Sequence, residues 1–178
     1  MGAKSEPEAA DKFAGFLQET VSCVTDEWLT NFHQSKKLYK IWTHPPISLS
    51  TQSGAKPLLS VTQVFTVVPD PLDEGTFKAK TREYSYRLTT SAATGQRETV
   101  SYHWHPHEFE VRYPHLHVGR VPRVHFPTSR VCLEDFILML IKYYGVKPMM
   151  RTQEWKNVLL KNKTAFEKWA TWKIQQPT

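Results

Sequence analysis

The feature that constrains the fold most is the alternation of large apolar side chains with small or polar ones in residues 76–90 and 97–105. Successive side chains of a β-strand point to opposite faces of the sheet, so a period of two is typical of strands with one buried face. The connecting stretch SAATGQ, residues 91–96, supplies the small residues and the glycine of a turn, which indicates a long hairpin. The side chains that share the predicted core face are Tyr84, Tyr86, Leu88, Val100, Tyr102 and Trp104.

Histidines crowd the end of this hairpin and the stretch after it, since residues 103–119 contain five of the eight in the chain. In the second strand they take alternate positions, on the face opposite the core. The short segment HLHV, residues 115–118, alternates in the same way. If this segment joins the same sheet with its apolar side inward, alternation gathers four imidazoles on one surface. These four predicted catalytic residues are His103, His105, His115 and His117.

Residues before the hairpin suggest a tail, a helix and one more strand. Residues 1–8 are expected to be a disordered tail. Apolar residues then recur at three-four spacing over residues 9–34, which predicts a helix with a break near Ser22. Residues 58–69, LLSVTQVFTVVP, are β-branched and aromatic and predict a strand.

Residues after the sheet return to helical spacing. Apolar side chains on one face predict a helix that reaches residue 144, with Gly145 as its stop. A last helical region is expected over residues 152–172, in two parts divided near Asn162. The order helix, sheet, helices predicts an α+β fold with an N-terminal helix, an antiparallel sheet of about four to five strands and C-terminal helices, with residues 9–178 as a single domain.

Cysteine content and hydropathy limit the setting of the protein. Only Cys23 and Cys132 could pair, so no disulfide framework is expected, and a reducing, cytoplasmic location is predicted. No apolar run has the length of a membrane span, and the first ten residues lack the apolar core of a signal peptide. We therefore expect no membrane association.

The net charge of +6 is concentrated at the C-terminal end of the chain. Residues 1–141 contain 15 Lys or Arg and 15 Asp or Glu, whereas residues 142–178 contain 8 and 2. A basic region interleaved with aromatic residues can attract a polyanion such as RNA in a salt-sensitive way. The alternative is that these lysines are an ordinary solvated helix surface.

The clustered histidines suit acid–base chemistry on RNA without a metal ion. Histidine titrates near neutrality, so one imidazole can deprotonate a 2′-hydroxyl while another protonates the leaving oxygen. Nearby cationic and hydroxyl side chains could bind the phosphate and stabilise developing charge. The predicted substrate-binding residues are Arg112, Arg120, Arg123, Arg130, His125, Thr128 and Ser129.

A metal site is the alternative for the same segment, because two imidazoles two residues apart on a strand can share an ion. A third ligand would come from a neighbouring strand, and the candidates are His115, His117, His125, Glu108 and Glu110. His103 and His105, followed by Glu110, resemble part of the first cupin motif, a histidine-and-glutamate metal site on β-strands. The flanking glycines of that motif are out of place, and nothing resembles the second cupin motif. We therefore expect no tightly held metal ion and no cofactor.

A broader pattern covers roughly residues 84–144. It consists of the segments YSYRL (84–88), YHWHP (102–106), PHLHVGR (114–120) and HFPTSRVCLEDFILMLI (125–141). This pattern resembles the TumE-like toxins of bacterial toxin–antitoxin pairs. The resemblance implies a small antiparallel sheet with histidine-rich strand ends followed by a helix, and it carries over His115 and His117 as functional residues. The N-terminal helix and the basic C-terminal region go beyond the toxin pattern.

These observations lead to one principal hypothesis and two alternatives. The principal hypothesis is a cytoplasmic protein whose His/Arg surface acts on nucleic acid, most concretely by toxin-like or defence-related RNA cleavage or binding. The first alternative is a metal-binding cupin-like enzyme. The second is a non-catalytic subunit or interaction protein of a larger complex. The expected partners are RNA and a protein such as an antitoxin or a complex subunit.

Overall fold

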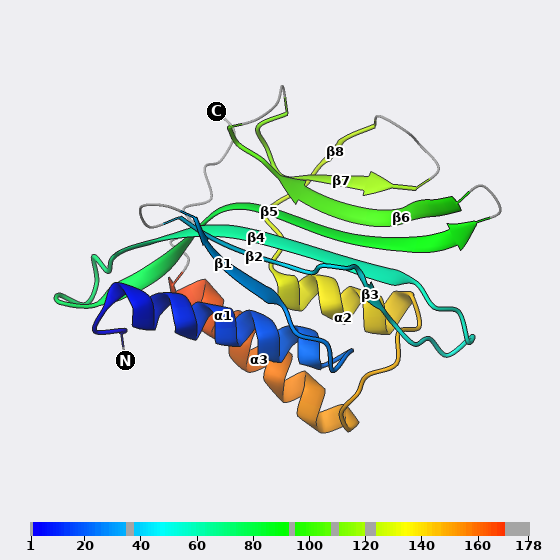
Figure 1. Cartoon of the computed structure of the whole chain (residues 1–178), viewed down its shortest axis with the longest axis horizontal. Coiled ribbons are helices and arrows are strands. Elements are labelled where there is room, and N and C mark those ends of the chain that lie inside the picture. Colours follow the sequence, from blue (N-terminus) through cyan, green and yellow to red (C-terminus); the bar gives the residue numbers. More distant parts are fainter. Residues whose placement is uncertain (1, 35–37, 93–94, 108–110, 120–123, 170–178) are drawn as a thin grey trace.

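The computed structural model describes residues 2–34, 38–92, 95–107, 111–119 and 124–169. Within these ranges it contains three helices and eight strands (Figure 1). The elements are α1 (Glu6–Ser22), β1 (Thr30–Gln34), β2 (Leu38–Trp42), β3 (Ile47–Ser48), β4 (Leu58–Pro69), β5 (Phe77–Ala92), β6 (Gly95–Trp104), β7 (His115–Val118), β8 (Phe126–Pro127), α2 (Leu133–Tyr143) and α3 (Thr152–Trp169).

The strands form one antiparallel sheet in the order β1-β2-β4-β5-β6-β7-β8, and β3 also pairs with β4. The predicted α+β class, with an N-terminal helix and C-terminal helices, is confirmed. The eight strands of the described residues exceed the four to five that were expected. Two of the additional strands, β3 and β8, contain only two residues each, which is too short for an alternation pattern to appear.

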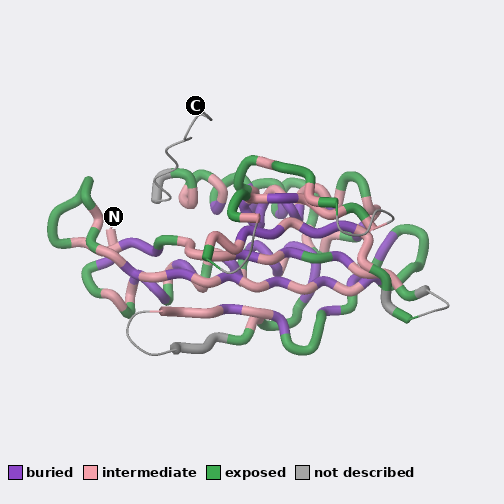
Figure 2. Tube along the Cα trace, turned by 90° about the horizontal axis from the view of Figure 1, so that it is seen from above, coloured by how far each residue is buried: buried purple, intermediate pink, exposed green. Residues whose placement is uncertain are grey.

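The predicted hairpin is formed by β5 and β6, and it has the expected buried face. Its cross-strand pairs are Tyr84 with Trp104, Tyr86 with Tyr102, and Leu88 with Val100. All of these side chains are buried except Tyr102, which is partly buried against the core. On the other side of β5, strand β4 alternates buried and partly buried positions along its length (Figure 2). Alternation therefore predicts correctly which face of the central strands is the core face.

All three helices lie on that core face of the sheet (Figure 1). The ring of Phe136 in α2 lies 5.7 Å from the ring of Tyr86 and 6.1 Å from that of Tyr102. In α1, Phe13 lies edge-on to Phe65 of β4, with 4.7 Å between the ring centroids. The opposite face of β5, β6 and β7 is consequently free to form a solvent-facing site.

The N-terminal residues differ from the expectation of a disordered tail over residues 1–8. Of these, residues 2–8 are described, and α1 already begins at Glu6. The backbone N–H of Glu8 donates a hydrogen bond to Oγ of Ser5 over 3.3 Å, which caps the helix. Ala3 pairs with Phe77 at the start of β5 and is fully buried. The expectation was wrong because it overlooked the serine cap and the proline in the first turn.

The predicted helix over residues 9–34 is also corrected, because α1 ends at Ser22 and residues 30–34 form β1. Apolar spacing continues beyond Ser22, but it does not mark one continuous buried face, since Val24 is buried whereas Trp28 is 79% exposed. Strand β1 instead pairs with β2 along residues 38–42. Pairing within a sheet here overrides local helical periodicity.

The C-terminal helices follow the prediction except for one division. Helix α2 ends as expected, with Gly145 in the left-handed region at φ +66°. Helix α3 is continuous from Thr152 to Trp169 rather than divided near Asn162. The side chain of Asn162 points inward, and its Nδ2 donates to the backbone oxygen of Phe16 over 3.1 Å, so this polar residue serves packing. No helix in the described residues is long and apolar enough to cross a membrane.

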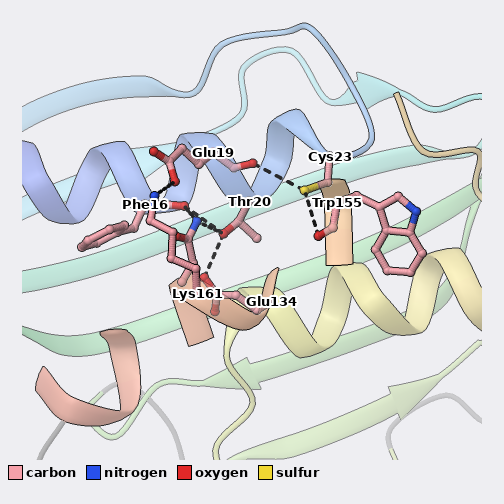
Figure 3. A network of polar contacts seen from close by, with 8 residues as sticks. Phe16, Glu19, Thr20, Cys23, Glu134, Trp155 and Lys161 are labelled. Carbon is pink, nitrogen blue, oxygen red and sulfur yellow. Dashed lines mark hydrogen bonds and ion pairs between the residues drawn. The ribbon is translucent and has the colours of Figure 1, made fainter. Parts of the chain in front are cut away.

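A buried polar network joins the three helices (Figure 3). Thr20 in α1 places its hydroxyl oxygen 2.9 Å from Oε1 of Glu134 in α2 and 3.3 Å from Nδ2 of Asn162 in α3. Burial raises the pKa of the Glu134 carboxyl, although hydrogen bonding by Thr20 opposes this effect. At the rim of the network, Nζ of Lys161 lies 3.0 Å from the carboxylate of Glu19. The helical layer thus contains one acid that the fold favours in its neutral form.

A histidine pocket on the open face of the sheet

The register of β6 and β7 gathers the histidines as predicted. His103 lies directly opposite His115, and Ser101 lies directly opposite His117. Side chains at directly opposed positions share one face of the sheet. Tyr102, between the two β6 positions, points to the core face instead. The expected grouping of histidines opposite the core is therefore confirmed.

Strand β8 brings a further histidine to the same face. Leu116 of β7 pairs with Phe126 of β8, and the same antiparallel register carried one residue further places His125 beside His117. The ring of His125 lies 4.6 Å from that of His117 and 4.6 Å from that of His115. The sequence pattern suggested His125 as a phosphate contact and as one of several candidates for a third metal ligand, but it gave no position for His125 in the sheet, because a two-residue strand gives no periodic signal.

These side chains surround one pocket, open to solvent, with a volume of about 270 Å³. Its residues come from β5, β6, β7 and the segments next to them. All four predicted catalytic histidines line it, together with His125. The complete lining is Arg87, Glu98, His103, His105, Val111, His115, His117 and His125. The catalytic roles of these histidines stay a prediction.

Among the described residues that line the pocket, the Lys or Arg side chain is that of Arg87, which sequence reasoning missed. Arg87 in β5 lies opposite Ser101, so one row of side chains crosses the sheet from Arg87 through Ser101 to His117. Its Nε lies 2.9 Å from a carboxylate oxygen of Glu98, and its side chain remains 44% exposed. A signal was present in the sequence, because Arg87 follows the core-facing Tyr86 and so had to point to the histidine face.

Three of the pocket imidazoles, those of His103, His115 and His117, favour the neutral form. His103 is 8% exposed and its Nε2 lies 2.8 Å from Oγ of Ser101. Burial, with a smaller contribution from the charge of Arg87, lowers the pKa of His103 to about 3. Burial also lowers the pKa values of His115 and His117, and neighbouring histidines add to that effect. Near neutral pH these rings offer unprotonated nitrogens to the pocket.

Two further contacts orient individual rings. Nδ1 of His115 lies 3.0 Å from the backbone oxygen of Tyr113. A carbonyl oxygen can only accept a hydrogen bond, so Nδ1 of His115 carries the hydrogen and Nε2 has the free lone pair. At the other end of the pocket, Nδ1 of His105 lies 3.6 Å from a carboxylate oxygen of Glu83, which can pair with the ring when it is protonated.

Other predicted substrate-binding residues do not line the pocket. Arg112 is exposed in the segment before β7, and Ser129 is exposed after β8. Arg130 lies over the ring of Trp104, with Cζ 3.4 Å from the ring centroid, and therefore sits on the core side of β6. The hydroxyl of Thr128 is buried, without a hydrogen-bond partner. Arg112 and Arg130 were expected to supply positive charge to the site, but the arginine that lines the pocket is Arg87 of β5.

Some predicted residues cannot be placed. Arg120 and Arg123 lie outside the described residues, as does Glu110 of the cupin-like pattern. Among the residues that are described, the group able to hold a metal ion is not the pair suggested by sequence. It is His115, His117 and His125, whose ligand nitrogens lie within 4.8 Å of one another.

Within the described residues, the basic helix α3 lies on the helical side of the sheet, away from the pocket (Figure 1). In α3, Nζ of Lys163 lies 2.8 Å from the carboxylate of Asp135, and Lys161 pairs with Glu19. The side chains of Lys168 and Lys173 fall outside the described part of the chain. The paired lysines of α3 therefore do not extend the surface around the histidines.

Comparison of the chain with models of known protein families, with curated proteins and with solved structures gives no match.

Proposed function

We propose that the histidine pocket is the active site of an enzyme that cleaves phosphodiester bonds, with RNA as the most concrete substrate. The observation that carries this proposal is the convergence of five imidazoles and Arg87 on one open pocket. Several of these side chains belong to paired strands, which hold functional groups in place more firmly than loops do.

The residue types suit a phosphate ester. A guanidinium is charged at any physiological pH and matches the geometry of phosphate oxygens, so Arg87 can bind the scissile group. Unprotonated imidazole nitrogens can accept a proton from an attacking hydroxyl or can hold a metal ion that does so indirectly. Glu98 would be displaced from Arg87 when phosphate binds, since both compete for the same donors.

The mechanism that the sequence favours needs no metal, and it stays a prediction. One pocket imidazole accepts the proton of a 2′-hydroxyl as its oxygen attacks phosphorus, and the 5′-oxygen leaves with a proton from a second imidazole. His105 can supply this second ring, because the carboxylate of Glu83 can pair with it when protonated. Arg87 stabilises the charge that develops on the phosphate.

Cleavage of a fluorescently labelled single-stranded RNA by the full-length protein, with and without added zinc or manganese, tests the proposal. Loss of one charge-stabilising group typically lowers the rate by about 10²–10³, so we expect that loss for Arg87→Ala. His44→Ala is the matched control, because His44 is exposed and outside the pocket. Absence of cleavage under both conditions, or equal rates for Arg87→Ala and the wild type, would contradict the proposal.

A toxin-like or defence-related role is the biological form of this proposal, and it rests on the pattern resemblance to the TumE-like toxins. This role includes a cytoplasmic location, consistent with the free thiols of Cys23 and Cys132, and a protein partner such as an antitoxin. Induced expression of the wild type should arrest bacterial growth, and expression of Arg87→Ala should not. Equal growth with both proteins would contradict the toxin role and leave the RNA assay as an independent test.

A further inference from the structure

We infer that His115, His117 and His125 bind one divalent transition-metal ion, for which zinc is the best fit. This inference goes beyond the proposed function, because it concerns the binding of an ion and not the cleavage of RNA. The primary observation is that the three ligand nitrogens lie within 4.8 Å of one another. The rings come from two neighbouring strand segments on the solvent-facing side of the sheet.

The separation of the nitrogens is close to what a zinc ion requires. Zinc binds imidazole nitrogen at about 2.0–2.1 Å with tetrahedral angles, so two ligand nitrogens are about 3.4 Å apart. Nitrogens that begin within 4.8 Å of one another reach this spacing by small rotations of the rings. The backbone need not move, because the pairing of β7 with β6 and β8 already sets the positions of the three residues.

A second observation comes from the outer contact of His115. Its Nδ1 donates to the backbone oxygen of Tyr113 over 3.0 Å. Metal-binding histidines almost always donate their second ring N–H to a carbonyl or carboxylate, which fixes the tautomer and the ring orientation. This hydrogen bond leaves Nε2 of His115 as the ligand atom, as a metal site needs.

The donor set indicates the class of metal. Imidazole favours zinc, copper, iron and nickel, whereas magnesium and calcium prefer oxygen ligands. Three neutral ligands would also leave the charge of the ion uncompensated and one coordination position open. That position would face the pocket, where Arg87 and His103 lie, so an anionic oxygen would be favoured there.

The sequence led to the opposite expectation for an identifiable reason. The sequence pattern indicated His103 and His105 as the ligand pair, with His115, His117 and His125 only as candidates for a third ligand, and its match to the cupin spacing was incomplete. The structure brings together a different set, because His125 joins His115 and His117 through the pairing of β8 with β7. His103 and His105 then lie beside the metal position rather than in it.

The test is zinc titration of the full-length protein, purified without an affinity tag and stripped of metal by a chelator. We expect one zinc per chain by calorimetry, and visible absorption bands of four-coordinate cobalt when cobalt replaces zinc. His125→Ala should weaken zinc binding at least 100-fold and abolish the cobalt bands. His44→Ala is the matched control, since His44 is an exposed histidine outside the pocket, and this variant should bind zinc as the wild type does.

Absence of stoichiometric zinc binding by the wild type would overturn the inference, as would equal binding by His125→Ala. His117→Ala provides a second ligand variant, and circular dichroism checks that each variant is folded. If a ligand variant is unfolded, the melting temperature of the wild type with and without zinc decides, because a bound ion must raise it. Failure to cleave RNA leaves these readouts unchanged, so the two proposals fail separately.

Discussion

Replacing Gly119 by alanine should push β7 away from β6 and damage the pocket without touching any histidine. Gly119 directly follows β7, and its N–H donates to the backbone oxygen of Thr99 over 3.1 Å. A Cβ atom at this position would lie 1.9 Å from the backbone oxygen of Glu98 and 3.1 Å from Cα of Thr99. Backbone atoms of a paired strand cannot rotate away, so the end of β7 must move by more than about 1 Å to reach an ordinary contact.

The cost can be estimated from this contact. Overpacking that forces a backbone shift typically costs about 1–3 kcal/mol in the free energy of unfolding. For a protein of this size, each kcal/mol lowers the melting temperature by about 2–4 °C, so we expect a decrease of about 2–12 °C. Because β7 carries His115 and His117, Gly119→Ala should also weaken zinc binding and RNA cleavage.

Gly15→Ala is the matched control for this prediction. Gly15 lies within α1, and apart from its chain neighbours and the backbone of its own helix no atom is within 4 Å of an added Cβ. Alanine stabilises a helix interior by about 0.5–1 kcal/mol relative to glycine, so this variant should melt at or above the wild-type temperature. Thermal unfolding followed by circular dichroism measures both variants. An unchanged melting temperature for Gly119→Ala would refute the close contact between β6 and the end of β7.

Three further predictions concern the helical layer. Burial raises the pKa of Glu134 above its ordinary value of 4.5. The stability that the neutral acid contributes is therefore fully present below pH 4.5, and it is lost as the pH rises through the pKa of the folded state. The free energy of unfolding, measured with urea, should therefore fall more between about pH 5 and about pH 8 for the wild type than for Glu134→Gln. Parallel pH profiles of the two proteins would contradict this. Phe136→Ala empties a fully buried position between α2 and the sheet and should cost about 3–5 kcal/mol in urea unfolding, whereas a cost below about 1 kcal/mol would not fit the packing. The sequence predicts that C-terminal lysines add salt-sensitive attraction for RNA, but Lys161 and Lys163 each contact an acid on the far side from the pocket. RNA binding measured by fluorescence anisotropy across a salt series tests this. Changing Lys161 and Lys163 to Gln should alter the slope of log affinity against log salt by less than about 1.4, the change expected if both lysines contacted phosphates.

The sequence predicts the core hairpin and the histidine face well, because both depend on local geometry. The side chains of a strand alternate whatever its partners are, so Trp104 facing the core requires His103 to face away from it. The end of α2 at Gly145 is equally local, because that glycine adopts a left-handed conformation that other residues avoid.

What the sequence misses depends on which segments pair across the sheet. Residues 30–34 continue a helical spacing yet form an edge strand, because β2 offers them a partner. His125 gains its neighbours only through two residues of β8, and Arg87 reaches the pocket through its register with Ser101. No local pattern indicates the pairing of β8 with β7, so the set of three proposed metal ligands could be recognised only in the folded chain, whereas the alternation of β5 already implied the face to which Arg87 points.

The most direct test of the histidine pocket as a functional site is a crystal structure of the zinc-soaked protein, with anomalous diffraction measured on both sides of the zinc absorption edge. We expect one zinc peak in the pocket, at about 2.0–2.1 Å from a ring nitrogen of each of His115, His117 and His125. The fourth coordination position of the zinc ion should face Arg87. Absence of a peak there, or a single peak held by other residues, would contradict the account.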